Sequence, residues 1–155
     1  MAIDKVKKFF AERGEPERVV EFEESTATSE DAAKVLNCEV GRIAKTISVF
    51  VKNNPVLILM SGDTKLDNKK FRERFGCRPH MIPVDEVENL IGHAVGGVCP
   101  FAVNEGVPIY IDEALKRFEY VYPAAGSSNS IAKFTLEELP RYVNFSDWVD
   151  VSKFS

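Results

Sequence analysis

Apolar side chains recur at helical spacing in several parts of the chain. Ile3, Val6 and Phe10 lie three or four residues apart and Gly14 follows them, which predicts an amphipathic helix over residues 3–13. Similar spacing, bordered by residues that favour helix starts and ends, predicts four further helices. We expect one to begin at Ser29, one to run from a cap at Asp67 to Phe75, and two to cover residues 84–91 and 136–142, the last kinked or ended by Pro140.

Other stretches alternate between apolar and polar side chains, which is typical of β-strands. The most regular covers residues 43–51; a turn at residues 52–55 then leads to an antiparallel partner at 56–60. Further strands are expected at residues 19–23, 107–111, 119–122 and 131–135. Because helices and strands mix without strict alternation, the pattern predicts a single mixed α/β domain over residues 1–155, with a largely antiparallel twisted sheet and helices around it.

The composition is typical of a water-soluble globular protein. The 155 residues are 45% hydrophobic and 28% charged, and the longest clean apolar run covers only residues 56–60. A membrane-spanning helix needs about 20 apolar residues, and charges in the first eight positions interrupt the place where a secretory signal would be apolar. The three cysteines, Cys38, Cys77 and Cys99, are scattered and form neither a zinc motif nor a disulfide pattern. We therefore expect a cytoplasmic protein without a metal, another cofactor or a membrane partner.

Charge is unevenly distributed along the chain. The net charge of −4 at pH 7 argues against a protein that coats nucleic acid, which would need a basic surface. Residues 65–78 nevertheless carry six basic and only two acidic side chains. Such a local basic strip suits a small anionic target better than a long duplex, and the alternative interpretation is a solvated helix face.

Lys45 lies on the apolar face of the strand predicted at residues 43–51. Successive side chains of a strand point to opposite faces, so Lys45 shares its face with four β-branched residues, Ile43, Ile47, Val49 and Val51. One interpretation is a lysine near a strand end whose stem extends to solvent. The other is a lysine that points into a cleft toward a phosphate or a developing anion, a role that suits a point charge with three donors.

Two glycine-containing loops are further candidates for a binding site. In residues 96–100 the missing side chains would let backbone groups contact a ligand, although the same sequence is typical of a tight turn. Residues 126–129 have a generic turn composition. His93 and Cys99 lie six residues apart, which permits a Cys–His pair. The sequence holds no Gly-x-Ser-x-Gly, Walker or His-Glu-x-x-His motif.

Three segments taken together resemble one known family. Residues 43–47 (IAKTI), 92–101 (GHAVGGVCPF) and 122–130 (YPAAGSSNS) are similar, in order and over nearly the whole chain, to the YbaK-type aminoacyl-tRNA deacylases. These deacylases resemble the editing (insertion) domain of bacterial prolyl-tRNA synthetase. The resemblance implies a free-standing enzyme that acts in trans. It would hydrolyse the ester that links a wrong, small amino acid to the 3′-terminal adenosine of tRNA.

The resemblance also assigns roles to residues. It implies that Lys45 engages the terminal nucleotide and that the backbone from Gly97 to Pro100 holds the aminoacyl group. Attack by water would be helped by the substrate's own groups, such as the ribose hydroxyl. Since relatives differ at the positions of Thr46 and Ser130, the amino-acid preference stays open. The residues expected to line the substrate site are Thr46, His93, Gly96, Val98, Cys99, Gly126, Ser128, Asn129 and Ser130.

Within the basic strip, Lys65, Lys69, Lys70 and Arg72 are the side chains that we expect to meet the tRNA backbone. The expected partner is aminoacyl-tRNA, and a cognate aminoacyl-tRNA synthetase is a further option. Two other functions stay open. One is a module that binds aminoacyl-tRNA or a nucleotide without catalysis, and the other is a thiol hydrolase that uses Cys99 and His93.

Overall fold

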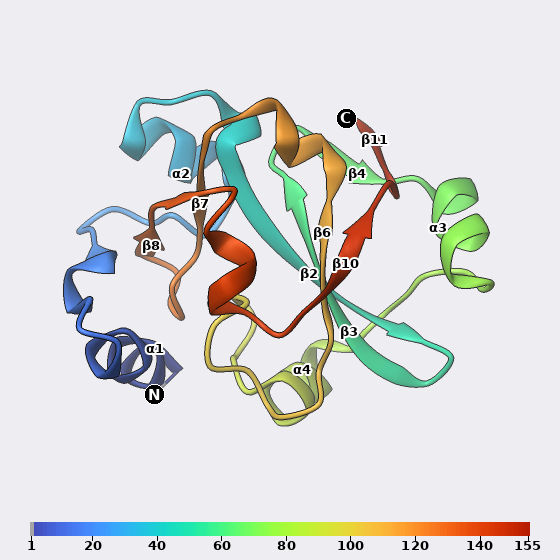
Figure 1. Cartoon of the computed structure of the whole chain (residues 1–155), viewed down its shortest axis with the longest axis horizontal. Coiled ribbons are helices and arrows are strands. Elements are labelled where there is room, and N and C mark those ends of the chain that lie inside the picture. The colour runs from blue at the N-terminus through green and yellow to red at the C-terminus, as the bar shows by residue number, and fades with distance from the viewer. Residues whose placement is uncertain (1) are drawn as a thin grey trace.

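A mixed sheet of seven strands forms the centre of the molecule (Figure 1). The computed structural model describes residues 2–155, and Met1 lies outside the described residues. The sheet has the order β10-β6-β3-β2-β7-β9, and β5 pairs separately with β2. Its strands are β2 (Ile43–Val51), β3 (Asn54–Ser61), β5 (His80–Met81), β6 (Ile109–Asp112), β7 (Tyr120–Pro123), β9 (Phe134–Thr135) and β10 (Phe145–Val149).

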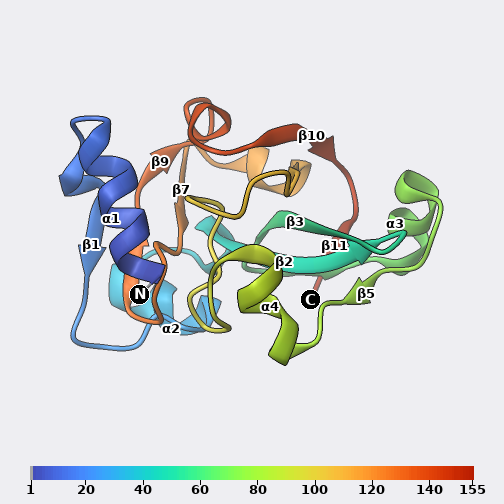
Figure 2. The same ribbon diagram turned by 90° about the horizontal axis from the view of Figure 1, so that it is seen from below.

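Two small ribbons and the helices complete the fold. Each ribbon has two antiparallel strands: β1 (Val19–Glu21) with β8 (Ser130–Ala132), and β4 (Thr64–Leu66) with β11 (Ser152–Phe154). Figure 2 shows α1 beside β1, β7 and β9 at one end of the molecule and α3 at the other end. The α-helices are α1 (Ala2–Glu12), α2 (Ser29–Leu36), α3 (Asn68–Phe75) and α4 (Val84–Ile91), and 3-10 turns lie at η1 (Pro16–Arg18), η2 (Val40–Arg42), η3 (Glu113–Arg117) and η4 (Leu139–Tyr142).

The mixed α/β class is confirmed, and so is the central hairpin. Lys52 and Asn53 connect β2 to β3 with φ angles of 50° and 71°, as a two-residue type I′ turn requires. Among the described strands, five of the eight pairings are antiparallel. The parallel contacts of β6 with β3 and β10, and of β7 with β2, had no signature in the sequence because they join segments far apart in the chain.

Some predicted boundaries were wrong. The strand expected at residues 131–135 is two strands, because β8 pairs with β1 whereas β9 pairs with β7. The helix expected at residues 136–142 is only the 3-10 turn η4, which has proline in its first turn. The helix α2 begins at Ser29 as predicted, and Thr28 is its cap, since its side chain accepts a hydrogen bond from the backbone of Asp31. The strands β10 and β11 were not foreseen.

The ends of the other helices follow from their capping residues. Asp67 accepts hydrogen bonds from the first backbone N–H groups of α3, and Gly76 and Gly92 end α3 and α4 in left-handed conformations. None of the helices within residues 2–155 has the length and apolar character needed to cross a bilayer.

The larger core lies on the face of the sheet that α1 and α4 cover. Phe10 of α1 packs against Phe101 and Phe134, with ring centroids 5.0 and 5.9 Å from its own. Phe101 belongs to the loop that follows α4. The loop and α1 are therefore fixed by the same aromatic cluster.

A buried histidine closes the loop of residues 92–101. His93 Nε2 lies 2.7 Å from the carbonyl oxygen of Phe101, so this nitrogen carries the proton and donates it. The side chain is fully buried, and within residues 2–155 its Nδ1 has no hydrogen-bond partner. Burial lowers the pKa of His93 below its ordinary value, and nearby Lys5 lowers it further, although the bond to Phe101 opposes both effects. The loop is thus held by a neutral imidazole.

This arrangement predicts an acid-sensitive fold. An unfolded histidine takes up a proton near pH 6.5, whereas folded His93 resists it, so stability is full above that pH and falls as the pH drops toward the lowered pKa. The loss should reach about 1.4 kcal/mol per pH unit within that window. In His93→Gln, which keeps a donor without this titration, the melting temperature should change less between pH 7.5 and 5.5 than in the unchanged protein. His80→Gln, at an exposed position, is the matched control. An identical pH dependence in His93→Gln and the unchanged protein would contradict the assignment.

Candidate functional site

A gap in strand pairing along β2 opens a hollow of about 300 Å³. On the side of β2 away from β3, Ile43 and Ala44 pair with β7, and Val49 and Phe50 pair with β5. Among the described strands, none pairs with β2 between these two contacts. Residues 45–48 therefore form a short open edge inside the sheet, and residues from both faces of the strand line the hollow.

Thr46 presents unsatisfied polar groups at this edge. The carbonyl of Ser48 points away from β3, since it accepts a hydrogen bond from Ile82 N. Backbone groups two residues apart in a strand point to the same side, so the N–H and C=O of Thr46 also face the gap. In addition, Thr46 Oγ1 is buried and has no hydrogen-bond partner within residues 2–155. Buried polar groups are nearly always paired, so this edge is suited to a polar ligand.

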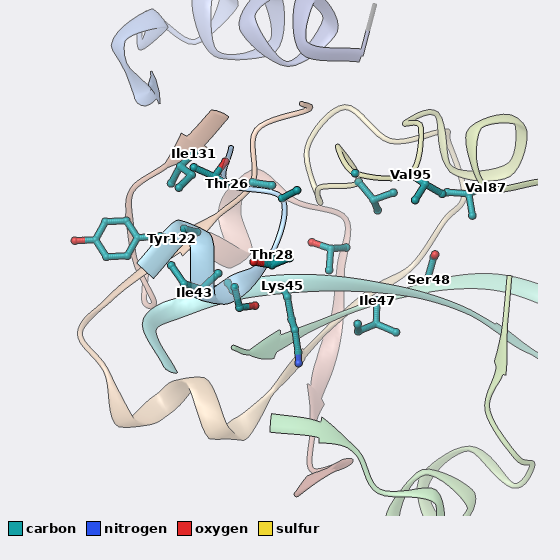
Figure 3. A pocket seen from close by; sticks show the side chains of 18 of the residues that line it. Thr26, Thr28, Ile43, Lys45, Ile47, Ser48, Val87, Val95, Tyr122 and Ile131 are labelled. Atoms are coloured by element: carbon teal, nitrogen blue, oxygen red, sulfur yellow. The ribbon is translucent and has the colours of Figure 1, made fainter. Parts of the chain in front are cut away.

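Lys45 lines the hollow with its stem and extends beyond it. Figure 3 shows Lys45 and Ile47 on one side of β2, and Ser48, Thr26 and Val95 on the other. The half-buried Lys45 donates a hydrogen bond from Nζ to the carbonyl of Thr64. Burial lowers the pKa of this ammonium, and the carboxylates of Glu30 and Asp63 partly oppose that effect. The lysine is therefore a cation at a partly desolvated boundary of the site.

The mouth of the hollow is polar on one side and apolar on the other. Segment 26–29, which leads into α2, contributes hydroxyl groups, and Figure 3 shows Thr26 and Thr28 over β2. The opposite side carries Met81, Val84 and Val95, whose exposed fractions are 59%, 73% and 57%. The sequence analysis did not identify either side.

The two glycine-containing loops predicted at residues 96–100 and 126–129 lie in direct contact. A Cβ atom on Gly97 would come within 2.7 Å of the carbonyl oxygen of Gly126, and one on Gly126, where φ is +102°, would come within 2.9 Å of Ile3 Cα in α1. Backbone atoms cannot give way to such contacts, so both positions need glycine. The packing places Gly96 and Val98 at the hollow, and they join Lys45 and Thr46 there.

The serine-rich loop of residues 126–130 does not line the hollow and instead supports one of its walls. Ser127 Oγ donates to Ser130 Oγ at 2.7 Å, and Asn129 Nδ2 donates to the carbonyl of Phe22 at 2.8 Å. The carbonyl of Ser128 accepts from Thr26 N at 2.7 Å. The predicted residues Gly126, Ser128, Asn129 and Ser130 are not among the residues that line the hollow. Ser128 and Asn129 instead hold segment 22–26, whose Thr26 lines it.

The side chains of His93, Cys99 and Pro100 are buried beneath the loop and do not reach the hollow. Burial raises the pKa of the Cys99 thiol to about 12. His93 Nε2, 3.5 Å from Cys99 Sγ, already donates its proton to Phe101 and cannot act as a base. The option of a thiol hydrolase therefore lacks an ionisable, accessible nucleophile.

The basic strip lies apart from the hollow. Lys65, Lys69 and Arg72 are exposed, whereas Lys70 Nζ is bound by Asp150 Oδ1 at 3.1 Å and by the carbonyl of Ser152 at 2.8 Å. Lys70 thereby ties α3 to β11. In the described part of the chain, no group of three His, Cys, Asp or Glu side chains is arranged to hold a metal ion.

Comparison with known proteins relates this site to a function. Residues 23–142 match the family model of the aminoacyl-tRNA editing domain. The chain is 40% identical over 154 residues to the uncharacterized protein YwhH of Bacillus subtilis (strain 168), covering 99% of this chain and 98% of that protein. It is 28% identical over 132 residues to the proline–tRNA ligase of Lactobacillus helveticus (strain DPC 4571), covering 80% of this chain but only 22% of the ligase.

A solved structure extends the agreement to three dimensions. The crystal structure of a proposed trans-editing enzyme for prolyl tRNA synthetase has a TM-score of 0.87 with this chain at 30% identity, covering 98% of this chain and 97% of that one. The matched family segment contains the open edge of β2 and both glycine loops. This chain therefore belongs to the aminoacyl-tRNA editing domain family.

Proposed function

We propose that this protein is a free-standing deacylase that hydrolyses the ester of a mischarged aminoacyl-tRNA carrying a small amino acid. The observation that carries the proposal is the hollow at the open edge of β2, where Lys45 and the unpaired polar groups of Thr46 meet the backbone of Gly96. Membership in the editing-domain family and the likeness to a proposed trans-editing enzyme support it.

The hollow suits a reaction that needs no side-chain nucleophile. Its lining includes hydroxyl groups and one lysine, while Cys99 and His93 are buried and do not line it. An aminoacyl ester is already activated, so fixed hydrogen-bonding groups and a placed water can suffice, with help from the ribose hydroxyl. In this mechanism the N–H of Thr46 and the backbone of Gly96 and Val98 hold the aminoacyl group, and Lys45 contacts the terminal nucleotide.

The size of the hollow favours a small amino acid. Its volume of about 300 Å³ lies at the lower end of the range for ligand sites. The apolar side chains of Ile82, Val87 and Val98 are among those that line it. Alanine, serine, cysteine and threonine are the candidates. Charged tRNA is a cytoplasmic substrate, and a prolyl-tRNA synthetase is the partner that the family relationship suggests.

A panel of mischarged tRNAs tests the proposal. The protein should release at least one small amino acid from tRNA well above the spontaneous rate, and it should leave tRNAs charged with large amino acids intact. The measurement is the release of labelled amino acid under single-turnover conditions. If every charged tRNA survives stoichiometric protein, the deacylase is excluded, and tight binding of those tRNAs would identify a non-catalytic module.

Replacement of Lys45 tests its role in the site. Lys45→Met keeps the packing of the stem and removes a charge that burial disfavours, so the melting temperature should stay the same or rise. Deacylation should nevertheless fall about 30- to 1000-fold in kcat/KM, as for loss of a charge-assisted contact in a partly desolvated site. Lys8→Met, at a side chain that is 80% exposed on α1, is the matched control. Full activity of Lys45→Met would show that Lys45 contributes only to the structure of the strand and not to deacylation.

Replacement of Cys99 separates the ester mechanism from thiol hydrolysis. Cys99→Ala should retain most of the activity, because a buried thiol with a pKa of about 12 supplies no thiolate near neutral pH. The lost packing should lower the stability by about 1–2 kcal/mol. Both effects can be measured by deacylation kinetics and thermal unfolding. An acyl-thioester trapped on Cys99, or loss of turnover in a folded variant, would establish thiol chemistry instead.

A further inference from the structure

A second hollow, of about 450 Å³, lies on the far side of Lys45 from the Gly96 loop. Strand β11 and the turn η3 form its walls, with Thr64, Arg117, Ser152, Lys153 and Phe154 among the lining residues. Thr64 lies between Lys45 and the second hollow, because its carbonyl accepts the hydrogen bond of Lys45 and its residue lines the second hollow.

An exposed aromatic ring lies at this surface. Phe154 pairs with Thr64 across the β4–β11 ribbon, and its exposed fraction is 65%. The guanidinium carbon of Arg117 lies 4.9 Å from the centroid of its ring. Aromatic and guanidinium groups are the ones on which proteins stack the bases of single-stranded nucleic acid without regard to sequence.

Two positive charges lie on the same ribbon as that ring, one residue along each strand and therefore on its opposite face, and Lys153 also lines the hollow. Lys65 and Lys153 are directly opposite each other in the ribbon and both are exposed. Like charges in this position destabilise a strand pair, and neither lysine has an ion pair within residues 2–155. A phosphate between or beside the two ammonium groups would relieve this repulsion.

The acidic groups nearby are already engaged. Asp63 is paired with Arg117 at 2.7 Å, Asp150 with Lys70 at 3.1 Å and Glu113 with Lys116 at 3.0 Å. Asp67 accepts from the start of α3, and those bonds, together with the charge of Lys153, lower its pKa. The charge left unpaired on the ribbon is therefore positive, on a domain whose net charge is −4.

We propose that this surface binds the unpaired nucleotides that precede the terminal adenosine of the tRNA, with Phe154 under a base and Lys65 and Lys153 at phosphates. The proposal rests on the proposed function for the identity of the RNA. An unstacked base matches the exposed ring of Phe154, and its phosphates match the two lysines on the other face of the same ribbon. Thr64, which is bonded to Lys45, places this ribbon next to the proposed deacylation site.

Binding of uncharged tRNA tests the surface apart from catalysis. The two probes are a tRNA transcript with its unpaired 3′ nucleotides and the same transcript without them, and the measurement is the dissociation constant by fluorescence anisotropy. Phe154→Ala should raise the dissociation constant for the complete transcript about 5- to 100-fold and change that for the shortened transcript little. Phe154→Trp should bind the complete transcript at least as tightly as the unchanged protein.

Charge reversal provides a second, independent variant. Lys65→Glu places opposite charges across the ribbon, so the melting temperature should stay the same or rise. Binding of the complete transcript should nevertheless weaken, and the slope of log K against log salt should become shallower by about 0.7 for the lost phosphate contact. Lys8→Glu on α1 is the matched control and should leave both quantities unchanged.

The outcomes separate this proposal from the proposed function. Equal effects of Phe154→Ala on both transcripts, or no effect on either, would overturn the binding surface even if the protein deacylates tRNA. Weaker binding of the complete transcript alone would support the surface even if no charged tRNA in the panel is hydrolysed.

Discussion

The open edge of β2 is the constraint on which the rest of the site depends. Two short strands, β7 and β5, pair with the ends of β2 and leave its middle without a described strand on the side away from β3. An unpaired stretch inside a sheet exposes backbone donors and acceptors that are costly to leave unsatisfied. Here no other described strand covers these donors and acceptors. They line a hollow instead, where a polar ligand can pair with them.

Close backbone packing fixes the loops around that edge. Gly97 and Gly126 touch each other, and Gly126 also rests on Ile3 of α1, so the first helix, the loop after α4 and the serine-rich loop form one rigid support. The buried ring of His93 and the aromatic cluster around Phe10 stabilise the same support from below. The hollow therefore keeps its shape without a contribution from side chains that would need to ionise.

Electrostatics divides the surface into two regions that meet at Lys45. On the side of Thr46 the site offers neutral donors and acceptors, which suit an ester and an amino acid. On the side of Thr64 it offers unpaired ammonium groups and an exposed aromatic ring, which suit a nucleic-acid strand. In the proposed function, a lysine at this boundary, partly desolvated and bonded to a backbone carbonyl, would contact both parts of an aminoacyl-tRNA end.

The sequence by itself determined the local structure and the key residue types. Periodicity and capping residues predicted the helices and the central hairpin, and the phase of residues 43–51 singled out Lys45. Pairing between distant segments was decided only by the tertiary structure, because parallel contacts such as β6 with β3 have no local signal. For the same reason the sequence did not reveal that Thr46 lies at an open edge, or that Phe154 pairs with Thr64, whose carbonyl accepts the hydrogen bond of Lys45. Each of these depends on which segments pack together, and burial and proximity arise from that packing.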